Sequence, residues 1–264
     1  MSIEAPSGNW IRFTRKLLKI FLYTDLKAES DRVFWHRDFG LLTQAFCGLG
    51  HEARLVIHPV NDNQAATQNG GGNITKEPVI WASPLDVRNE GWWKSHRPDL
   101  VILGLWTRPK YDSIRLAALA ATPRVIERAD SDGMRTASCG LWNYAHRRYD
   151  YFRDRTFGIP FFFSVPLSVL YSVASLLATP WVESRLAKTL KLIPVMTVET
   201  PQAESLWKLL ATRLGADPGR IRHVPHPVQT RIFFPDPSFP KANQVISVGR
   251  WEAHQKNLPL LLKT

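Results

Sequence analysis

The sequence predicts an α/β protein with a doubly wound parallel sheet, and three observations support this fold class. Short apolar runs at residues 19–24, 50–57, 99–104 and 124–129 have the length and composition of buried strands. Segments with helical spacing of apolar residues lie between them, as in successive βα units. With 264 residues, 44% of them hydrophobic, the chain can bury the core of one large or two modest domains.

The first strand, at residues 19–24, lies in a basic and apolar stretch that Lys19 interrupts, so this stretch is too short for a signal-peptide core. A helix follows at residues 32–49, and Gly48 and Gly50 predict its end. Its apolar positions recur at helical spacing: Phe34, Leu41, Leu42, Ala45 and Phe46. His51 stands at the turn into the second strand, where a structural role is favoured over a catalytic one.

The same alternation continues along the chain. A polar loop at residues 61–76 precedes a short strand at 78–82, and a helix at about 111–121 separates the strands at 99–104 and 124–129. Further elements are predicted as a strand at 195–200, a helix at 201–214 and a strand at 221–228. A last strand at 245–248 is followed by an apolar run at 258–262 that begins another helix.

Residues 248–257 read Val-Gly-Arg-Trp-Glu-Ala-His-Gln-Lys-Asn. Gly249 permits a sharp turn after the strand, and Arg250 and Lys256 place two cations beside the positive end of the next helix, an arrangement that suits a diphosphate. This stretch resembles the opening of the donor-binding domain in glycosyltransferases of GT-B fold, family 4. The resemblance implies that Gly249, Arg250 and Lys256 bind the diphosphate of a nucleotide sugar. From spacing alone, two cations on an ordinary βα loop are an equal alternative.

The preceding segment resembles the interdomain passage of the same family, in which a strand ending in Ser or Thr precedes a helix and then a V-I-P-N-G-V-D stretch. Here His226 and Pro227 replace the usual Asn and Gly, and Pro227 cannot adopt a positive φ, so this hinge turns differently. The resemblance spans residues 19–263 and is most specific at 195–256.

The resemblance implies a GT-B-type, Rossmann-like arrangement of two domains. We expect a nearly complete acceptor-side domain at residues 1–230 and only the start of a nucleotide-sugar-binding domain at 231–264. The chain is then a glycosyltransferase fragment that is inactive alone.

Ligands of open α/β sheets bind outside the carboxyl ends of the strands. The first strand leads into Asp25 there, the strand at 99–104 leads into residues 106–108, and the strand at 124–129 leads into Asp130 and Asp132. We predict Asp130 and Asp132 as the catalytic residues that orient an acceptor hydroxyl, with capping of a turn or helix as an equally weighted alternative. Glu127 is expected to face a neighbour in the sheet.

Residues 156–182 contain no charged side chain. Prolines at 160, 166 and 180 divide this run, so the longest expected helix, 166–179, is about 20 Å long and shorter than the roughly 30 Å core of a bilayer. Its Ser and Thr residues form one stripe. Such a helix either packs inside the protein through this stripe or lies on a membrane, and the basic and aromatic residues at 144–155 and 185–191 favour an anionic membrane surface.

The formal net charge of +11 indicates an anionic partner. Nucleic acid is a disfavoured partner, because no nucleic-acid-binding motif accompanies the basic cluster at 144–155. Walker, Gly-x-Gly-x-x-Gly, hydrolase-elbow and metal-ligand patterns are absent from the sequence. We therefore expect no metal and no cofactor, a nucleotide-sugar donor, a saccharide or lipid-linked acceptor, and a cytoplasmic location on the inner face of a membrane. The alternative is a non-catalytic acceptor-binding or membrane-docking module.

Overall fold

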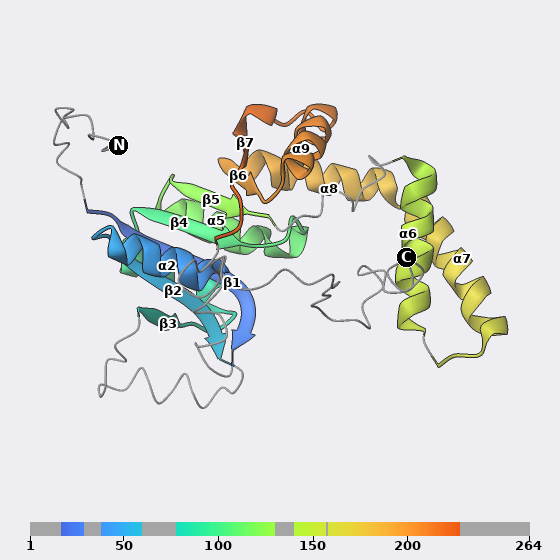
Figure 1. The fold of residues 1–264 in the computed structure, drawn as a ribbon, viewed down its shortest axis with the longest axis horizontal. Coiled ribbons are helices and arrows are strands. Elements are labelled where there is room, and N and C mark those ends of the chain that lie inside the picture. Colours follow the sequence, from blue (N-terminus) through green and yellow to red (C-terminus); the bar gives the residue numbers. More distant parts are fainter. Residues whose placement is uncertain (1–16, 29–37, 60–77, 130–139, 157, 228–264) are drawn as a thin grey trace, which may run out of the picture. The chain divides into compact units, whose positions relative to one another are not determined.

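The structure, a computed structural model, describes residues 17–28, 38–59, 78–129, 140–156 and 158–227. Within these residues seven strands form one parallel sheet in the order β3-β2-β1-β4-β5-β6-β7, which confirms the predicted α/β class and doubly wound sheet (Figure 1). The strands are β1 (Lys19–Ala28), β2 (Glu52–Pro59), β3 (Val79–Trp81), β4 (Leu100–Gly104), β5 (Val125–Arg128), β6 (Val195–Val198) and β7 (Ile221–His223).

The helices lie between strands of the sheet, as in βα units, and those at Glu90–His96, Leu141–Arg155 and Thr179–Leu192 are additional to the predicted ones. The helices are α2 (Asp38–Gly48), α4 (Glu90–His96), α5 (Asp112–Ala121), α6 (Leu141–Arg155), α7 (Phe161–Leu177), α8 (Thr179–Leu192) and α9 (Pro201–Arg213). The chain divides into two compact units. The first unit comprises Met1–Asp130 and Leu192–Thr197, and the second comprises Ser131–Lys191 and Val198–Thr264.

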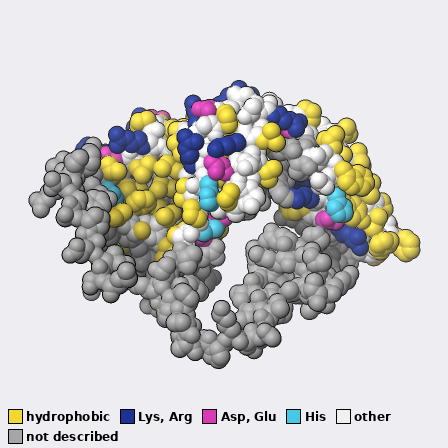
Figure 2. All heavy atoms as spheres, turned by 45° about the horizontal axis from the view of Figure 1, so that its top comes forward, with side chains coloured by type: hydrophobic (Ala, Val, Ile, Leu, Met, Phe, Trp, Pro, Cys, Tyr) yellow, Lys and Arg dark blue, Asp and Glu magenta, His cyan; other side chains and the backbone are white. Residues whose placement is uncertain are grey.

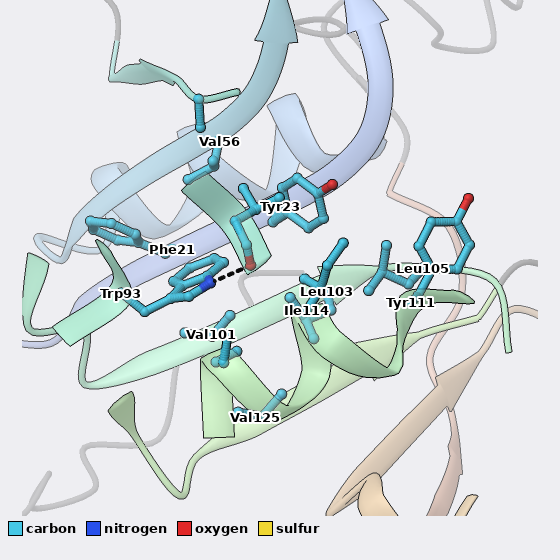
Figure 3. Packing of buried hydrophobic residues seen from close by; sticks show 14 residues of the cluster. Phe21, Tyr23, Val56, Trp93, Val101, Leu103, Leu105, Tyr111, Ile114 and Val125 are labelled. Atoms are coloured by element: carbon cyan, nitrogen blue, oxygen red, sulfur yellow. Dashed lines mark hydrogen bonds between the residues drawn. The ribbon is translucent and has the colours of Figure 1, made fainter. Parts of the chain in front are cut away.

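Both faces of the first unit's sheet are covered, because successive side chains of a strand point to opposite faces. In β1, Phe21 and Tyr23 join a core with Trp93 of α4 and Ile114 of α5, and the Trp93 indole donates to the Val87 carbonyl at 2.8 Å (Figure 3). The alternating β1 residues Ile20 and Leu22 pack on the opposite face against α2. The strands are thus buried on both sides, as their continuous apolar runs indicate.

Two local features shape the carboxyl end of β1. The register with β2 runs Tyr23 to Val56 and then jumps to Lys27 opposite His58, so β1 bulges between these pairs. Gly104 ends β4, and a Cβ at this position would lie 2.5 Å from the Phe39 ring of α2. The bulge and the glycine therefore fix how the chain leaves the two central strands.

Several predicted elements match the structure closely: the strands β3, β4, β5 and β6 and the helices α5 and α9. The helix α9 begins as the sequence indicates, with the Thr200 hydroxyl accepting a hydrogen bond from the Ala203 amide at 3.1 Å and Pro201 in the first turn. His51 has a structural contact, since its Nδ1 accepts a hydrogen bond from the Leu18 amide at 3.3 Å.

Three boundaries differ from the prediction. The strand β1 continues to Ala28 rather than ending at Thr24, because the bulge lets it resume pairing with β2. The strand β7 ends at His223, five residues earlier than expected. Residues 32–37 of the predicted first helix, the predicted strand at 245–248 and all of residues 231–264 lie outside the described residues.

In the second unit, α6 and α7 lie side by side (Figure 1). The Phe152 and Tyr171 rings stack at 4.7 Å between centroids, and the Ser172 hydroxyl donates to the Ala145 carbonyl at 2.7 Å. The prediction that Pro166 begins the long helix is wrong, because α7 runs for 17 residues from Phe161 through this proline. Pro166 has no N–H to donate to the Phe162 carbonyl, yet losing this one bond does not end the helix.

Among the described residues, no single helix is both long and apolar enough to cross a membrane. The pair α7 and α8 meets that criterion only when taken together, and the two helices are bent by 55° relative to each other.

Candidate functional site

The five predicted site residues, Asp130, Asp132, Gly249, Arg250 and Lys256, lie outside the residues that the structure describes. The structure therefore gives no geometry for the predicted catalytic pair or for the diphosphate site. It does describe Asp25 and residues 106–108, the other strand-end positions that the sequence singles out.

Asp25 lies where the strand order reverses. The first strand β1 is flanked by β2, which follows it in the chain, and by β4 on its other side. This is the topological switch point of an open α/β sheet, where ligands bind outside the carboxyl ends of the strands. Asp25 falls in the bulged part of β1, one residue after Thr24, which pairs with Gly104 of β4. The fold thus places an acidic side chain at the position that this class of sheet uses for ligands.

A buried histidine underlies this position. His58, near the end of β2, is 3% exposed, and its Nδ1 lies 2.7 Å from the Ala82 carbonyl, which can only accept, so Nδ1 carries the hydrogen. Its Nε2 lies 2.9 Å from the Tyr23 hydroxyl and 3.7 Å from Asp25. In the neutral imidazole Nε2 therefore accepts from Tyr23, and in the protonated imidazole it donates to the Tyr23 oxygen.

The Asp25 carboxylate is held from a second direction by the loop that follows β4. The hydroxyl of Tyr111 donates to Asp25 Oδ2 at 2.5 Å. Tyr111 is itself only 4% exposed and packs among the core side chains with its hydroxyl pointing away from them (Figure 3). Asp25 keeps 39% of its side chain exposed, whereas Tyr23, His58 and Tyr111 are buried beneath it. The carboxylate is therefore the member of the cluster that solvent or a ligand can reach.

The environment keeps both phenols neutral. Burial and the nearby charge of Asp25 raise the pKa of Tyr23 far above its ordinary value. Burial and the hydrogen bond to Asp25 also raise the pKa of Tyr111. Because neither phenol ionises readily, each serves as a hydrogen-bond donor that orients its acceptor, rather than as a base.

The loop after β4 is anchored by Arg115 of α5. Its guanidinium is 1% exposed and donates to both carboxylate oxygens of Glu127, Nε to Oε2 at 2.5 Å and one NH₂ group to Oε1 at 2.7 Å. The same guanidinium donates to the carbonyls of Trp106 at 2.7 Å and Arg108 at 3.1 Å and to Asp112 at 2.9 Å. The loop is therefore tied to β5 from inside, and Glu127 pairs with a helix residue rather than with a sheet neighbour as predicted.

Arg115 and Glu127 each shift the pKa of the other. Burial alone lowers the pKa of Arg115, but hydrogen bonding to Glu127 and its charge outweigh this effect and raise it. Burial raises the pKa of Glu127, and the hydrogen bonds from Arg115 act in the opposite direction. The two hydrogen bonds place the positive guanidinium directly against the negative carboxylate, and a buried charge needs such a partner.

An aromatic side chain stands at the neighbouring strand end. Trp106 is 40% exposed, and the Arg108 guanidinium lies 4.3 Å from its ring centroid. An indole held in this way offers a rigid, partly open surface of the kind that packs against the C–H groups of a sugar ring. Thr24 of β1 pairs with Gly104 of β4. Asp25 comes one residue after Thr24, and Trp106 comes two residues after Gly104.

A separate cluster of one glutamate and two histidines lies in the second unit, near the ends of β6 and β7. The Nε2 of His226 pairs with the Glu199 carboxylate, and His223 Nε2 lies 3.2 Å from the Glu199 carbonyl. Both histidines therefore contact Glu199, one through its backbone carbonyl and the other through its side chain. His226, which stands where the resembling family has Asn, is anchored to the end of β6.

Sequence reasoning found Asp25 but missed His58, Tyr111 and Arg115. The strand-end rule identifies His58 when it is applied to the second strand, because this histidine follows the apolar run that ends at Ile57. Arg115 carries a weaker signal, as the charged residue on the buried side of α5 beside Ile114. Nothing in the sequence connects Tyr111 with Asp25, which are 86 positions apart.

Within the described part of the chain, no group of three His, Cys, Asp or Glu side chains is placed to hold a metal ion. Comparison with models of protein families, with curated proteins and with solved structures finds no match to this chain.

Proposed function

We propose that this chain is the acceptor-side part of a GT-B glycosyltransferase, which transfers a sugar from a nucleoside-diphosphate sugar to an acceptor hydroxyl. The observation that carries the proposal is the Asp25 carboxylate, half exposed at the switch point of the parallel sheet and held by the buried Tyr111 hydroxyl. The family resemblance of residues 195–256 supports the same reaction class.

A saccharide acceptor suits this site better than an anionic one. A carboxylate accepts hydrogen bonds from two vicinal hydroxyls, and it repels phosphates and carboxylates. The exposed indole of Trp106 at the adjacent strand end supplies an apolar surface for the sugar ring. Asp25 and Trp106 thus provide the polar and apolar contacts that carbohydrate recognition requires.

In the proposed mechanism Asp25 accepts the hydrogen bond of the attacking acceptor hydroxyl and fixes its direction. Tyr111 keeps the carboxylate in place, and the buried Tyr23 and His58 support it from beneath. Asp130 and Asp132, which follow β5 in the chain, remain candidates for further acceptor contacts. Arg250 and Lys256 stabilise the negative charge that develops on the departing nucleoside diphosphate.

The donor half of the proposal is tested by calorimetry with UDP, GDP and ADP on the full chain. The proposal expects binding of one nucleoside diphosphate, and a loss of at least tenfold in affinity in the double variant Arg250→Ala/Lys256→Ala, since two cations contact the diphosphate. The control Lys27→Ala/Arg124→Ala removes two exposed cations from the first unit and should bind as the parent does. Equal binding by both double variants would refute the assignment of the cations.

The acceptor half is tested by saturation-transfer NMR with a panel of neutral mono- and disaccharides. Asp25→Asn should abolish or strongly weaken the signal of the sugar that binds. The matched control Glu90→Gln neutralises a carboxylate that is 53% exposed on α4 and should leave it unchanged. Saccharide binding without any nucleotide binding would support the alternative of a non-catalytic acceptor-binding module. Absence of both would sink the glycosyltransferase proposal.

A further inference from the structure

The helix α7 has its polar and apolar residues in the reverse of the usual arrangement for a helix at the surface of a protein in water. Between residues 158 and 181 every exposed residue is apolar. The buried residues of this segment are all small and polar: Ser164, Ser168, Ser172 and Thr179. A helix that faces water normally shows the opposite pattern. The polar stripe that the sequence predicts is thus used for packing within the protein, and the apolar face points outward.

The internal role of the stripe is visible in its hydrogen bonds. Ser172 bonds to a backbone carbonyl of α6, Ser168 bonds to the Ser164 carbonyl at 2.6 Å, and Thr179 bonds to the Ser175 carbonyl at 3.2 Å. The Ser172 bond joins α7 to α6, and the hydroxyls of Ser168 and Thr179 donate to carbonyls one turn earlier in their own helical segment. The contact with α6 therefore leaves the apolar face of α7 uncovered.

The uncovered face is large and carries bulky side chains. Its members stand out in Figure 2 as a band of hydrophobic side chains over α7, with basic side chains beside it. The most exposed are Phe161 (63%), Phe162 (86%), Phe163 (65%), Leu170 (65%), Leu177 (78%) and Trp181 (63%). Contiguous apolar surface of this kind marks a site of contact with a membrane or another protein.

An arginine stacks on an aromatic ring at each end of this face. The guanidinium of Arg153 lies 5.9 Å from the centroid of Phe161 at the amino end, and that of Arg185 lies 4.8 Å from the centroid of Trp181 at the carboxyl end. Aromatic rings paired with cations at the boundary of an apolar surface are typical of the membrane–water interface, where the ring enters the lipid and the cation stays at the headgroups.

The charges around the face are predominantly positive. Exposed cations on the flanking helices are Arg147 and Arg153 of α6 and Arg185, Lys188 and Lys191 of α8. The acidic side chains described on these helices already have partners, since Asp150 lies 3.4 Å from His146 and Glu183 lies 3.2 Å from Arg213. A surface that joins a broad apolar band to exposed cations complements a bilayer with anionic headgroups.

From these observations we infer that α7 docks this protein on a bilayer that contains anionic phospholipid, lying in the plane of the interface. The 17 residues of α7 span about 25 Å, less than the roughly 30 Å of a hydrocarbon core. The 55° bend into the cation-bearing α8 also favours a helix that lies in the interface over one that crosses the bilayer. A second copy of this chain is a poorer occupant, because the same row of cations would face itself.

The first test is vesicle flotation with the full chain. Vesicles of phosphatidylcholine alone are compared with vesicles of equal parts phosphatidylcholine and phosphatidylglycerol, and the protein should float with the second. The variants Phe162→Ser and Leu170→Ser should each weaken binding at least tenfold, because each removes a large apolar side chain from the inserted face. The matched control Leu209→Ser removes a leucine that is 61% exposed on α9 and should bind as the parent does.

The second test addresses the cations. Each basic residue near an anionic surface contributes about fivefold to binding, so Arg185→Gln/Lys188→Gln should weaken flotation roughly 25-fold. The control Lys27→Gln/Arg124→Gln removes the same charge elsewhere and should have a much smaller effect. Circular dichroism and thermal unfolding should be unchanged in all variants, since the altered side chains are exposed.

The inference fails if the parent chain floats with neither vesicle, or if the α7 variants float as well as Leu209→Ser. Sedimentation velocity without lipid identifies the other occupant: a dimer that Leu170→Ser dissociates, together with absent flotation, would assign the face to a second copy of the chain. The flotation result does not depend on nucleotide or sugar binding, so its outcome is separate from that of the proposed glycosyltransferase activity.

Discussion

Tyr111 and Asp25, 86 positions apart in the sequence, meet at the carboxyl edge of the sheet, where the phenol donates to Asp25 Oδ2 at 2.5 Å. This contact joins the bulged end of β1 to the loop after β4 across the switch point. A half-exposed carboxylate thereby acquires a fixed orientation from a buried donor.

Replacing Tyr111 with Phe removes this donor while keeping the ring in the core. We expect a loss of about 1.5 kcal/mol in the free energy of unfolding, at the lower end for a bond to a charged group, because solvent can rehydrate the exposed Asp25. Urea denaturation measures this loss. Sugar binding should weaken as well, because the carboxylate loses its orientation. Unchanged binding with the expected loss of stability would show that Tyr111 supports only the fold.

The buried pair of Arg115 and Glu127 makes a sharper prediction. Arg115→Met should cost about 3–5 kcal/mol in the free energy of unfolding, because it leaves the Glu127 carboxylate buried without its partner. The double variant Arg115→Met/Glu127→Leu should recover most of this loss, since neither charge remains. A double variant as unstable as Arg115→Met would instead assign the loss to the carbonyls of Trp106 and Arg108, which Arg115 also holds.

Gly104 should tolerate no side chain. In Gly104→Ala the new Cβ would lie 2.5 Å from the Phe39 ring, and overpacking of this kind costs about 1–3 kcal/mol. Adding Phe39→Leu should restore part of that loss by making room. Gly48→Ala is the control, because a Cβ at Gly48 would meet nothing within 4 Å. Thermal unfolding of these three variants and of the parent chain distinguishes a local clash from a general intolerance of alanine.

From the pKa shifts of Tyr23 and Tyr111 we predict how the free energy of unfolding changes at alkaline pH. The pKa values of Tyr23 and Tyr111 are raised in the folded state, whereas the unfolded chain ionises its phenols near pH 10. Their contribution is therefore complete below about pH 10 and is lost as the pH rises above that value, because the unfolded state then binds fewer protons. The slope of the free energy of unfolding against pH should be steep there.

Tyr111→Phe tests this linkage, because it removes one of the two late-ionising phenols. The alkaline slope should become shallower in this variant and stay unchanged in Tyr151→Phe, which alters an exposed ring of α6. Urea denaturation at several alkaline pH values gives the slopes. Equal slopes in the parent chain and in Tyr111→Phe would contradict the raised pKa of Tyr111.

The strands of this fold can be predicted from the sequence because they are buried on both faces and therefore read as continuous apolar runs. The position of Asp25 follows from the same information, since it comes directly after one of these runs. Its partners do not. The contacts of Asp25 with Tyr111 and of Tyr23 with His58 depend on which strands are neighbours, and hydrophobic patterning does not determine that order.

The helix α7 begins before Pro166, where the sequence predicts its start, for a different physical reason. A proline inside a helix removes one backbone hydrogen bond, and this local cost is why the sequence predicts that the helix begins at Pro166. Packing of α7 against α6 through Ser172 and Tyr171 outweighs this cost. The sequence alone leaves membrane docking and internal packing as alternatives for this helix. The structure shows that its stripe of serines packs internally while its apolar residues remain exposed, and both are possible because they occupy opposite sides of one cylinder.

Pro166 also sets a limit on how deeply α7 can sink into lipid. The Phe162 carbonyl has no N–H partner four residues later, and a carbonyl left without a hydrogen bond in hydrocarbon costs several kcal/mol. The first turn of α7 must then stay at a depth where water or lipid headgroups reach this oxygen, while Leu170 and Leu177 carry no such restriction. Within the interface, the amino end of α7 is therefore expected to lie slightly shallower than its carboxyl end.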